Sequence, residues 1–567
     1  MKIKDILTKA FGYTQNDSYH FTLPDSTINN KDTSTQNNET TFNKSQNVFT
    51  DINKTLDYIK TKYNLLINSD VITREFILNA KGKQFKAFLL YIDGMVDSQI
   101  LNDFVLKPLM MRNQNNFLKN QQSNIISESV TNNVTIRKVK KINLVDYVQS
   151  CLIPQNNIEL QSSFNDIFLG VNSGNCALFI DTLDSAFDID VKGFKQRSID
   201  KPENEIVIKG SHEAFVENIR TNTSLIRRFT NNENLVVENL EVGKLTKTKC
   251  AVCYMQNIAN DDLVAEVKYR INNVDVDSVL SAGQLEQLIS DNSALGLPKA
   301  LSTERPDNAA QHLLEGRVIV LINGSPFALI LPAIMIDFLT SPEDRNLKSI
   351  FANFLRCLRV ICTFFALLLP GLYVALTSFH IEILPTELLY SILAARENVP
   401  FPIIFEILIM EVSFEIIREA SLRVPSAIGS TIGIVGAIVI GQAAVSAGIV
   451  SPILIIIVAI TALSSFAIPD YGFSFHLRVF RFLFVFLGYI AGFLGIGTGL
   501  FVYLSTICNM ESFGVSYSIP YSSIKNLKRT GLLLPPIWKR EYRAPYLATK
   551  MEKKQKNISM KWKKEVN

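Results

Sequence analysis

The sequence is poor in the residue patterns that enzymes and metal proteins use. It has only five histidines in 567 residues, and they lie far apart. Its seven cysteines are scattered and odd in number, as expected for reduced thiols in a protein that faces the cytoplasm. Cys250 and Cys253 form one CxxC pair, but no second pair or nearby histidine completes a tetrahedral metal site. We therefore expect no metal, no cofactor and no catalytic activity.

A strong net charge and an amino-terminal leader are also lacking. The formal net charge of +4 is too small to indicate a nucleic-acid partner, and the basic clusters lie mainly after Lys525. A tail of this kind is typical of a solvated segment that faces anionic cytoplasmic lipid. At the start of the chain, Lys2, Lys4 and Asp5 interrupt the apolar residues, so no run is long enough for a signal peptide. We expect the soluble part of the chain to lie in the cytoplasm.

Charged residues are scarce between about residues 350 and 506, whereas the chain up to about residue 315 is rich in Asn, Asp, Lys and Thr. The mean hydropathy of +0.16 is high for a wholly soluble protein of this size. The contrast predicts an α/β soluble amino-terminal region, followed by an α-helical polytopic membrane domain.

Five parts of the chain follow from this contrast. Residues 1–51 form an Asn-rich tail that we expect to be disordered, because it has few apolar groups to bury. Two small α/β subdomains follow at residues 52–208 and 209–345. The transmembrane domain then covers residues 346–508, and a basic cytoplasmic tail covers residues 509–567.

Hydrophobic periodicity predicts alternating helices and strands in both subdomains. For the first subdomain we expect a helix that contains Leu56, Ile59, Tyr63 and Leu66, and strands at Phe85–Ile92, Cys176–Ile180 and Ile206–Ile208. For the second we expect a helix that begins at Gly210-Ser211, a strand at Val252–Met255, and helices at Leu263–Ile271 and Leu285–Ile289.

The stretch from Val318 to Leu339 is apolar enough to be taken for a membrane-spanning helix. Asn323-Gly324 is, however, a favoured two-residue turn between two strand-like runs, and Pro326 and Pro332 would interrupt a helix. We interpret the stretch as a β-hairpin at Val318–Ile322 and Phe327–Leu331, with a spanning helix as the alternative.

Four segments are apolar enough to span a bilayer. The clearest is Val360–Ser378, and Arg356 and Arg359 before it mark its cytoplasmic end. Pro370-Gly371 inside it predicts a kink whose free backbone groups need partners. The other three are Ala427–Gly448, Pro452–Ile468 and Leu483–Thr506, of which the last carries Gly495, Gly497 and Gly499 in a pattern that favours close helix packing.

The segment Phe401–Ala420 is apolar yet carries several charges. Each charge at mid-bilayer costs roughly 2.5 to 3.5 kcal/mol, so this helix must pack against protein or lie at the interface. Glu411, Glu415 and Arg418 share one helical face. They and Glu406 are candidates for gating or ion interaction, and an intra-helix Glu–Arg pair is the alternative.

The segment Gly429–Gly448 has two distinct helical faces. Gly429, Gly433 and Gly436 form a face suited to close helix packing. The second face mixes polar and apolar side chains without a fixed charge, which suits a narrow aqueous path with a hydrophobic constriction. Its residues are Thr431, Val435, Ile438, Gln442 and Ser446, and the alternative is ordinary packing and hydrogen bonding to a neighbouring helix.

Four long strings carry a resemblance to a known family: Arg197–Phe229, Thr303–Pro332, Arg396–Pro402 and Glu411–Pro469. They resemble the A subunit of the spore germinant receptors, the GerA family of endospore-forming bacteria. The resemblance covers roughly residues 52 to 540. The departures are modest: Asn323 replaces the usual Asp, and Asn398 and Ser421 stand where Gly is common.

The resemblance implies a multi-pass receptor subunit in the inner membrane of the dormant spore, with its soluble region in the cytoplasm. It implies assembly with a transporter-like B subunit, which senses the nutrient, and a lipoprotein C subunit. It further implies a homo-oligomeric ring in contact with membrane lipid, which acts as a ligand-gated ion channel and releases cations to start germination. The alternative is a non-conducting scaffold that gathers the subunits and relays the signal.

Overall fold

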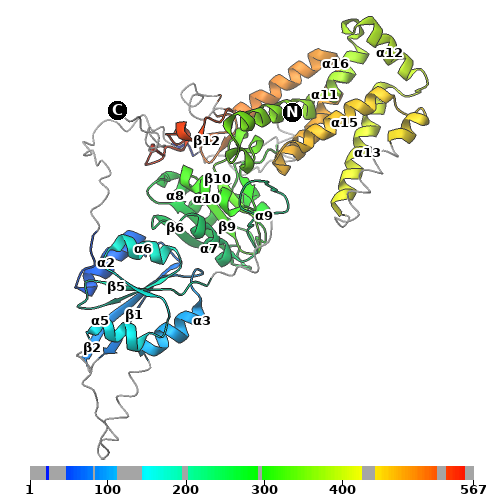
Figure 1. The fold of residues 1–567 in the computed structure, drawn as a ribbon. Coiled ribbons are helices and arrows are strands. Elements are labelled where there is room, and N and C mark those ends of the chain that lie inside the picture. Colours follow the sequence, from blue (N-terminus) through cyan, green and yellow to red (C-terminus); the bar gives the residue numbers. More distant parts are fainter. Residues whose placement is uncertain are drawn as a thin grey trace, which may run out of the picture.

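The computed structural model describes residues 21–23, 46–80, 83–110, 143–193, 202–291, 296–423, 441–519, 521 and 532–555. Two sheet-containing units follow one another along the molecule, and a group of long helices projects beyond the second unit (Figure 1). The α/β class expected for the amino-terminal region is confirmed. The Asn-rich tail lies largely outside the described residues.

The first unit is a five-stranded antiparallel sheet with helices on both faces. Its strands are β1 (Val71–Ala80), β2 (Lys83–Ile92), β3 (Ile158–Gln161), β4 (Cys176–Ile180) and β5 (Ala186–Ile189), in the order β1-β2-β4-β5-β3. Helices α2 (Ile52–Tyr63) and α6 (Phe164–Asn172) pack on one face. The segments α3 (Ser98–Ile100) with η1 (Leu101–Leu106) and α5 (Leu144–Tyr147) with η2 (Val148–Leu152) pack on the other (Figure 1).

The second unit repeats this topology. Its strands are β6 (Leu235–Val242), β7 (Thr248–Met255), β8 (Leu301–Thr303), β9 (Val318–Ile322) and β10 (Ala328–Leu331), in the order β6-β7-β9-β10-β8. Helices α7 (Ile219–Phe229) and α10 (Pro306–Glu315) cover one face, and α8 (Asp261–Asn272) and α9 (Ala282–Ile289) cover the other. If the strands of each unit are numbered 1 to 5 along the chain, their order in the sheet is 1-2-4-5-3 in both units. In both units, one helix precedes the first strand and another precedes the fourth.

A buried ion pair joins the two units. The Arg227 guanidinium on α7 contacts the Asp70 carboxylate through Nε at 2.5 Å and Nη2 at 2.6 Å. Asn68 beside it accepts from the backbone N–H of Val237 on β6 and donates to the carbonyl oxygen of Leu235. Because Arg227 is only 1% exposed, loss of Asp70 would leave a buried uncompensated charge, so this contact fixes one unit on the other.

Most predicted elements of the soluble units are present, but three details are wrong. Helix α2 ends at Tyr63, and Leu66 beyond it is 99% exposed. Residues 206–208 form no strand, because Ile206 and Ile208 point into solvent at 79% and 83% exposure. No helix begins at residue 210; α7 begins at Ile219, where the Asn218 side chain accepts hydrogen bonds from the N–H groups of Arg220 and Thr221.

The predicted hairpin is confirmed, but its turn is longer than two residues. Strands β9 and β10 pair antiparallel, with Leu321 opposite Ala328. The Asn323 N–H still donates to the Lys249 carbonyl of β7 at 2.9 Å, so Asn323 continues the sheet rather than the turn. The chain reverses after it, at Gly324 (φ 89°) and before Pro326, which has no N–H to donate.

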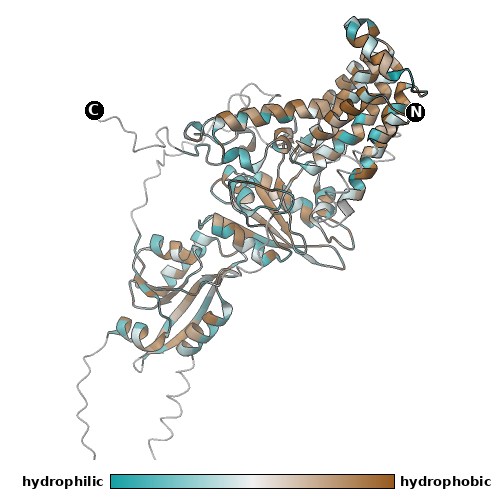
Figure 2. Ribbon diagram, turned by 45° about the vertical axis from the view of Figure 1, so that its right-hand side comes forward, coloured by the Kyte–Doolittle hydropathy of each residue, from teal (hydrophilic) through white to brown (hydrophobic). Residues whose placement is uncertain are grey.

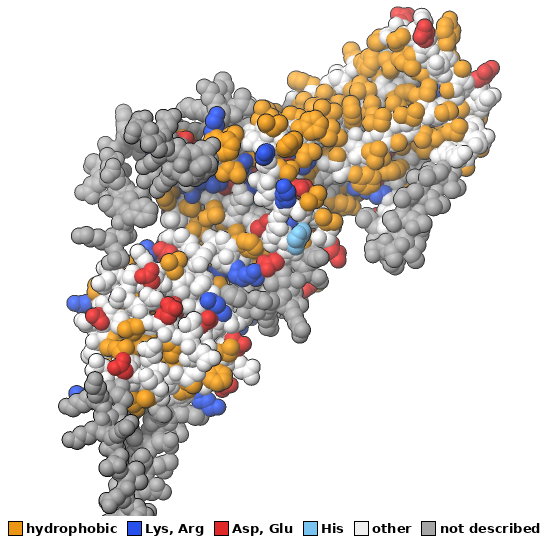
Figure 3. Space-filling model, viewed as in Figure 1, with side chains coloured by type: hydrophobic (Ala, Val, Ile, Leu, Met, Phe, Trp, Pro, Cys, Tyr) orange, Lys and Arg blue, Asp and Glu red, His pale blue; other side chains and the backbone are white. Residues whose placement is uncertain are grey.

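In the described part of the chain, the helical region contains α11 (Ser349–Ser378), α12 (Thr386–Arg396), α13 (Ile403–Arg423), the helical residues 441–446, α15 (Pro452–Phe466) and α16 (Tyr471–Cys508). Among the described residues, α11 and α16 are long and apolar enough to cross a membrane. Hydrophobic residues dominate these helices, in contrast to the mixed soluble units (Figures 2 and 3). A kink is expected at Pro370. Helix α11 is continuous through this residue, so the proline does not divide it.

The element α16 is two helices that fold back on each other. Ala491 (φ −134°) and Gly492 (φ 56°) are non-helical and separate a first arm (residues 471–490) from a second arm (residues 493–508). His476 and Tyr503, 27 positions apart, nevertheless touch, with 3.0 Å between Nε2 and the phenolic oxygen. In a straight helix they would lie about 40 Å apart. The single span predicted at Leu483–Thr506 is therefore wrong.

Glycines bring the helices of this region into close contact. A Cβ atom on Gly371 of α11 would lie 2.7 Å from the Phe484 carbonyl oxygen, and one on Gly488 would lie 2.6 Å from the Gly371 carbonyl oxygen. In the second arm, Gly495 and Gly499 meet Leu487 of the first arm, whereas Gly497 has open space. The packing role expected for glycines in this segment is thus confirmed for Gly495 and Gly499.

Part of the carboxy-terminal tail is folded onto the rest of the protein. The Tyr546 hydroxyl accepts from Arg317 at 2.9 Å, and Leu547 is fully buried. Nearer the helices, Asn353 of α11 exchanges two hydrogen bonds with the backbone of Leu534. The described residues 532–555 therefore connect the second unit with the first turns of α11.

Candidate functional site

A buried charge network joins α13 to the first arm of α16. Arg481 Nη2 lies 2.7 Å from Glu411 Oε2 and 3.2 Å from Glu415 Oε1. Arg478 Nη1 donates to Glu415 Oε2 at 2.8 Å. Because Glu411 faces Arg481 while Glu415 reaches back to Arg478, the two helices run antiparallel here. Glu411 and Arg481 are each 1% exposed, so the pair is enclosed by protein.

The intra-helix alternative for these glutamates is not what the structure shows. Among the described residues, both carboxylates make their ion pairs with α16. The Arg418 guanidinium instead lies over the Phe466 ring, 4.6 Å from its centroid. The sequence interpretation missed Arg478 and Arg481, although two arginines three positions apart before an apolar run share one helical face.

The guanidinium groups of this network are only partly hydrogen-bonded. Arg478 and Arg481 pair with Glu411 and Glu415. Nε and Nη1 of Arg481, and Nε and Nη2 of Arg478, have no hydrogen-bond partner among the described residues. Buried guanidinium groups of this kind are high in energy, so the local arrangement is sensitive to small shifts of either helix.

Glu406 has a different, structural environment at the other end of α13. Its Oε1 accepts from Arg396 of α12 at 3.1 Å, and its Oε2 accepts from the Ser451 N–H at 3.1 Å. Ser451 in turn caps α15, where its side chain accepts from the Leu454 N–H. Glu406 therefore fixes the connections among three helices and lies apart from Glu411 and Glu415.

The proposed pore face is described only in part. Gln442 and Ser446 lie in the helical residues 441–446, and both side chains are exposed. The candidates Thr431, Val435 and Ile438, and the packing glycines Gly429, Gly433 and Gly436, lie outside the described residues.

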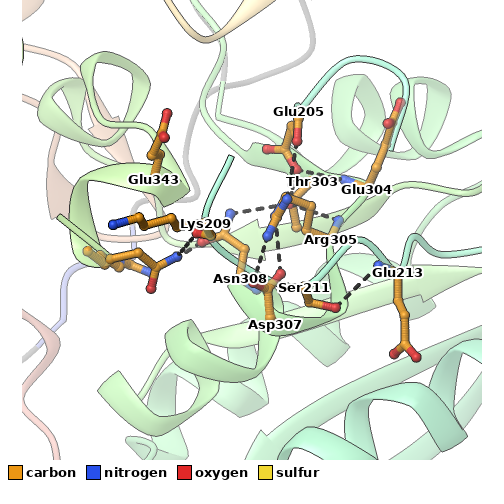
Figure 4. A network of polar contacts seen from close by, with 12 residues as sticks. Glu205, Lys209, Ser211, Glu213, Thr303, Glu304, Arg305, Asp307, Asn308 and Glu343 are labelled. Atoms are coloured by element: carbon orange, nitrogen blue, oxygen red, sulfur yellow. Dashed lines mark hydrogen bonds and ion pairs between the residues drawn. The ribbon is translucent and has the colours of Figure 1, made fainter. Parts of the chain in front are cut away.

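A second polar network, which the sequence interpretation did not predict, holds the segment between the two soluble units (Figure 4). Glu205 Oε2 accepts from Thr303 Oγ1 at 2.5 Å and from the Glu304 N–H at 3.2 Å. Glu304 Oε2 reciprocates by accepting from the N–H groups of Glu203 at 3.0 Å and Asn204 at 3.2 Å. Burial raises the pKa of Glu205 to about 7, despite the opposing hydrogen bond from Thr303.

Arg305 organises the centre of this network. It is fully buried and binds the Asp307 carboxylate through Nε at 3.1 Å and Nη2 at 2.8 Å (Figure 4). Its Nη1 donates to the Glu205 carbonyl oxygen at 3.3 Å. The segments 197–229 and 303–332, which carry two of the family-like strings, thus meet at one place.

The contacts continue from this network to α11. Arg345 Nη1 donates to Asn308 Oδ1 at 3.1 Å, and the Asn346 side chain donates to the Lys209 carbonyl oxygen at 2.6 Å. The fully buried Asp344 accepts from Arg356 at 3.1 Å and from Arg359 at 2.7 Å, both on α11. A continuous set of polar contacts therefore runs from the inter-unit segment to the base of the first long apolar helix.

No group of three or more His, Cys, Asp or Glu side chains that could hold a metal ion occurs in the part of the chain that the structure describes. Cys250 and Cys253 are both buried in β7, where burial raises the pKa of each thiol to about 12. Such thiols are protonated at neutral pH and are poor metal ligands.

Comparison with known proteins gives consistent matches. The chain is 37% identical to "Spore germination protein KA" of Bacillus subtilis (strain 168), over 87% of this chain and 86% of that protein. It is 35% identical to "Uncharacterized membrane protein YfkQ" of the same organism, over 81% of this chain and 84% of that protein.

Among solved structures, the chain is similar to the N-terminal domain of the A subunit of the Bacillus megaterium spore germinant receptor GerK3. The identity is 27%, over 51% of this chain and 98% of that one, with a TM-score of 0.37.

A family model described as "Bacillus/Clostridium GerA spore germination protein" matches residues 57–546. This match spans both soluble units, the helical region and most of the described tail. The chain therefore belongs to the GerA spore germination protein family.

Proposed function

We propose that this chain is the A subunit of a nutrient germinant receptor in the spore inner membrane. Several copies form a ring with a central, ligand-gated ion path, and its opening releases cations at the start of germination. The helical region crosses the membrane several times, with the soluble units and the tail in the cytoplasm. A transporter-like B subunit and a lipoprotein C subunit complete the receptor.

The exposure of Gln442 and Ser446 carries the pore proposal. Both are polar side chains exposed on the surface of a largely apolar helical region. Lipid offers no hydrogen-bond partners, so an amide or hydroxyl facing it costs free energy. A water-filled path shared by several copies satisfies these groups, and Thr431, Val435 and Ile438 extend the same face one to three turns earlier.

The contacts of Arg305 and Asp344 support a route for gating. In this proposal, a change between the soluble units alters the Glu205–Arg305 network and moves the base of α11. Helix α11 crosses the first arm of α16 at Gly371 and Gly488, and that arm carries Arg478 and Arg481 of the charge network. Because several N–H groups of Arg478 and Arg481 have no hydrogen-bond partner among the described residues, a modest shift of α16 changes its pairing with α13.

The direct test is cation flux in vesicles that contain the chain with its B and C partners. Val435→Ala and Ile438→Ala remove the narrowing side chains and are expected to raise the cation leak. Ile456→Ala is the matched control, because Ile456 is an exposed apolar residue (59%) on α15 and is not one of the residues proposed to line the path. Equal flux in all variants would contradict the conducting role.

Cysteine accessibility gives a second, independent test. Gln442→Cys in a cysteine-free background is expected to react with a charged, water-soluble thiol reagent in the activated receptor. Leu463→Cys, on an exposed apolar position of α15 (69%), is expected to remain unreactive in lipid. If both are unreactive, the face of Gln442 is not lined by water.

The alternative function is a non-conducting scaffold that assembles the subunits and relays the signal. The polar contacts between the second soluble unit and the tail favour a relay even without conduction. The oligomeric state of the purified receptor separates the two functions, because a closed ring supports a pore and a single copy that still supports germination supports the scaffold.

A further inference from the structure

An apolar surface lies where the first turns of α11 meet the carboxy-terminal segment. We call it the collar and define it as Ile350, Phe351, Phe354, Leu533, Ile537 and Trp538. These side chains are between 49% and 81% exposed. The two halves of the collar are held together, because the Leu534 N–H donates to Asn353 Oδ1 at 2.6 Å and Asn353 Nδ2 donates to the Leu534 carbonyl at 3.2 Å.

The collar is continuous with the outer surface of α11. Exposed apolar residues follow one another every three or four positions from Ile350 through Phe354, Leu358 and Ile361 to Phe365. Hydrophobic side chains cover the helices down to their junction with the soluble units, where basic side chains are mixed among them (Figure 3). Whatever covers the outer face of α11 therefore also meets the collar.

The length of α11 places the collar at the membrane surface. Its 30 residues span about 45 Å, whereas the hydrocarbon core of a bilayer is about 30 Å thick. The far end of α11 packs tightly on α16 at Gly371, so the excess length falls at the end beside the soluble units. The collar then lies in the headgroup layer, where Trp side chains are favoured.

The basic residues around the collar favour acidic lipid. Lys348 and Lys539 are exposed beside it, and Arg540 follows. The segments 348–358 and 532–540 contain no Asp or Glu. A surface of exposed aromatic and aliphatic groups with a basic rim is typical of binding to acidic lipid.

We propose that the collar binds the headgroup layer of an anionic membrane, with Trp538 in the interface and Lys348 and Lys539 on lipid phosphates. This proposal rests on the proposed membrane location of α11. The proposal has a consequence for the position of the second soluble unit. The same tail is bound to the second soluble unit through Tyr546 and through the Lys550–Asp261 ion pair at 2.6 Å, so the collar fixes that unit at the bilayer surface.

Tryptophan fluorescence of the full-length protein in lipid vesicles tests the collar directly. The chain has two Trp residues, so Trp562→Phe leaves Trp538 as the only reporter. We expect shallow brominated lipids to quench Trp538, and its emission to shift to shorter wavelength when phosphatidylglycerol is added to phosphatidylcholine. Lys348→Glu with Lys539→Glu is expected to abolish the effect of phosphatidylglycerol.

Two further reporters distinguish a failure of the collar proposal from a failure of the proposed membrane location. Each is a single introduced Trp in a variant that lacks both native Trp residues. Tyr269→Trp, on α8 of the second unit, is expected to be unquenched, and Ile361→Trp, on the outer face of α11, is expected to be quenched. If Ile361→Trp is quenched and Trp538 is not, the collar proposal is wrong while the membrane location stands. If neither is quenched, the membrane location itself is wrong. If Trp538 becomes buried only when partner subunits are added, the collar is a protein-docking surface and the lipid proposal is overturned.

Discussion

His476 and Tyr503 are hydrogen-bonded at 3.0 Å although they lie 27 positions apart in a nearly uninterrupted helical sequence. The contact exists because the backbone reverses at Gly492, whose φ of 56° is unfavourable for a residue with a Cβ atom. Both ends of α16 consequently approach the second soluble unit: Phe473 stacks on Phe338, and Met510 and Phe338 share one core.

The hairpin form of α16 predicts a short distance between its two ends. Spin labels at Phe475→Cys and Val502→Cys, in a cysteine-free background, are expected to lie within roughly 20 Å of each other, because the arms pack directly. A straight helix would place them about 40 Å apart. Labels at positions 475 and 490 are the control, because both lie in the first arm and the expected spacing of about 22 Å is the same in either case.

The crossing of α11 and α16 predicts different costs for different glycines. Gly488→Val is expected to destabilise the protein by about 1 to 3 kcal/mol or more, because its Cβ atom would lie 2.6 Å from the backbone carbonyl oxygen of Gly371. Gly497→Ala is the matched control, since no atom lies within 4 Å of its Cβ position and alanine favours a helix. Thermal unfolding in lipid nanodiscs measures both. Equal destabilisation by the two substitutions would contradict the close crossing.

The buried charge network predicts a strong effect of neutralising one partner. Glu411→Gln leaves Arg481 with Glu415 as its one remaining ion-pair partner among the described residues and is expected to cost about 3 to 5 kcal/mol. The double variant Glu411→Leu with Arg481→Met removes both charges and should recover much of that loss. Glu397→Gln, at an exposed position after α12, is expected to change the stability by less than about 0.5 kcal/mol. If the double variant is no better than the single one, the two residues are not energetically paired.

Glu205 predicts a defined pH dependence of stability. Burial raises its pKa to about 7 in the folded protein, above the ordinary value of 4.5. Between these values the folded state binds more protons than the unfolded state, so this carboxyl lowers the stability as pH rises from about 4.5 to 7. Other groups titrate in the same window, so the test is the difference between wild type and Glu205→Gln. We expect the wild type to lose more stability across the window, and parallel curves would contradict the shifted pKa.

Much of the soluble architecture could be read from the sequence. Val267 and Ile271 recur at helical spacing and predict a helix. The apolar run from Val318 to Ile322, which the turn signal Asn323-Gly324 follows, is typical of a buried strand. The local sequence pattern gave a wrong prediction where contacts with residues distant along the chain decide the backbone conformation. Ile206 and Ile208 look like a strand, yet their segment is held by Glu205 and Glu304 through bonds to residues about one hundred positions away.

The sequence by itself determined the division into polar units and an apolar helical region, because burial of apolar groups depends on composition and period. It also placed Glu411 and Glu415 on one helical face. Only the tertiary structure decided that their partners are Arg478 and Arg481, that α16 reverses at Gly492, and that the two soluble units share one strand order. Each of these depends on contacts between residues distant along the chain, and no local preference encodes which distant surface will be met.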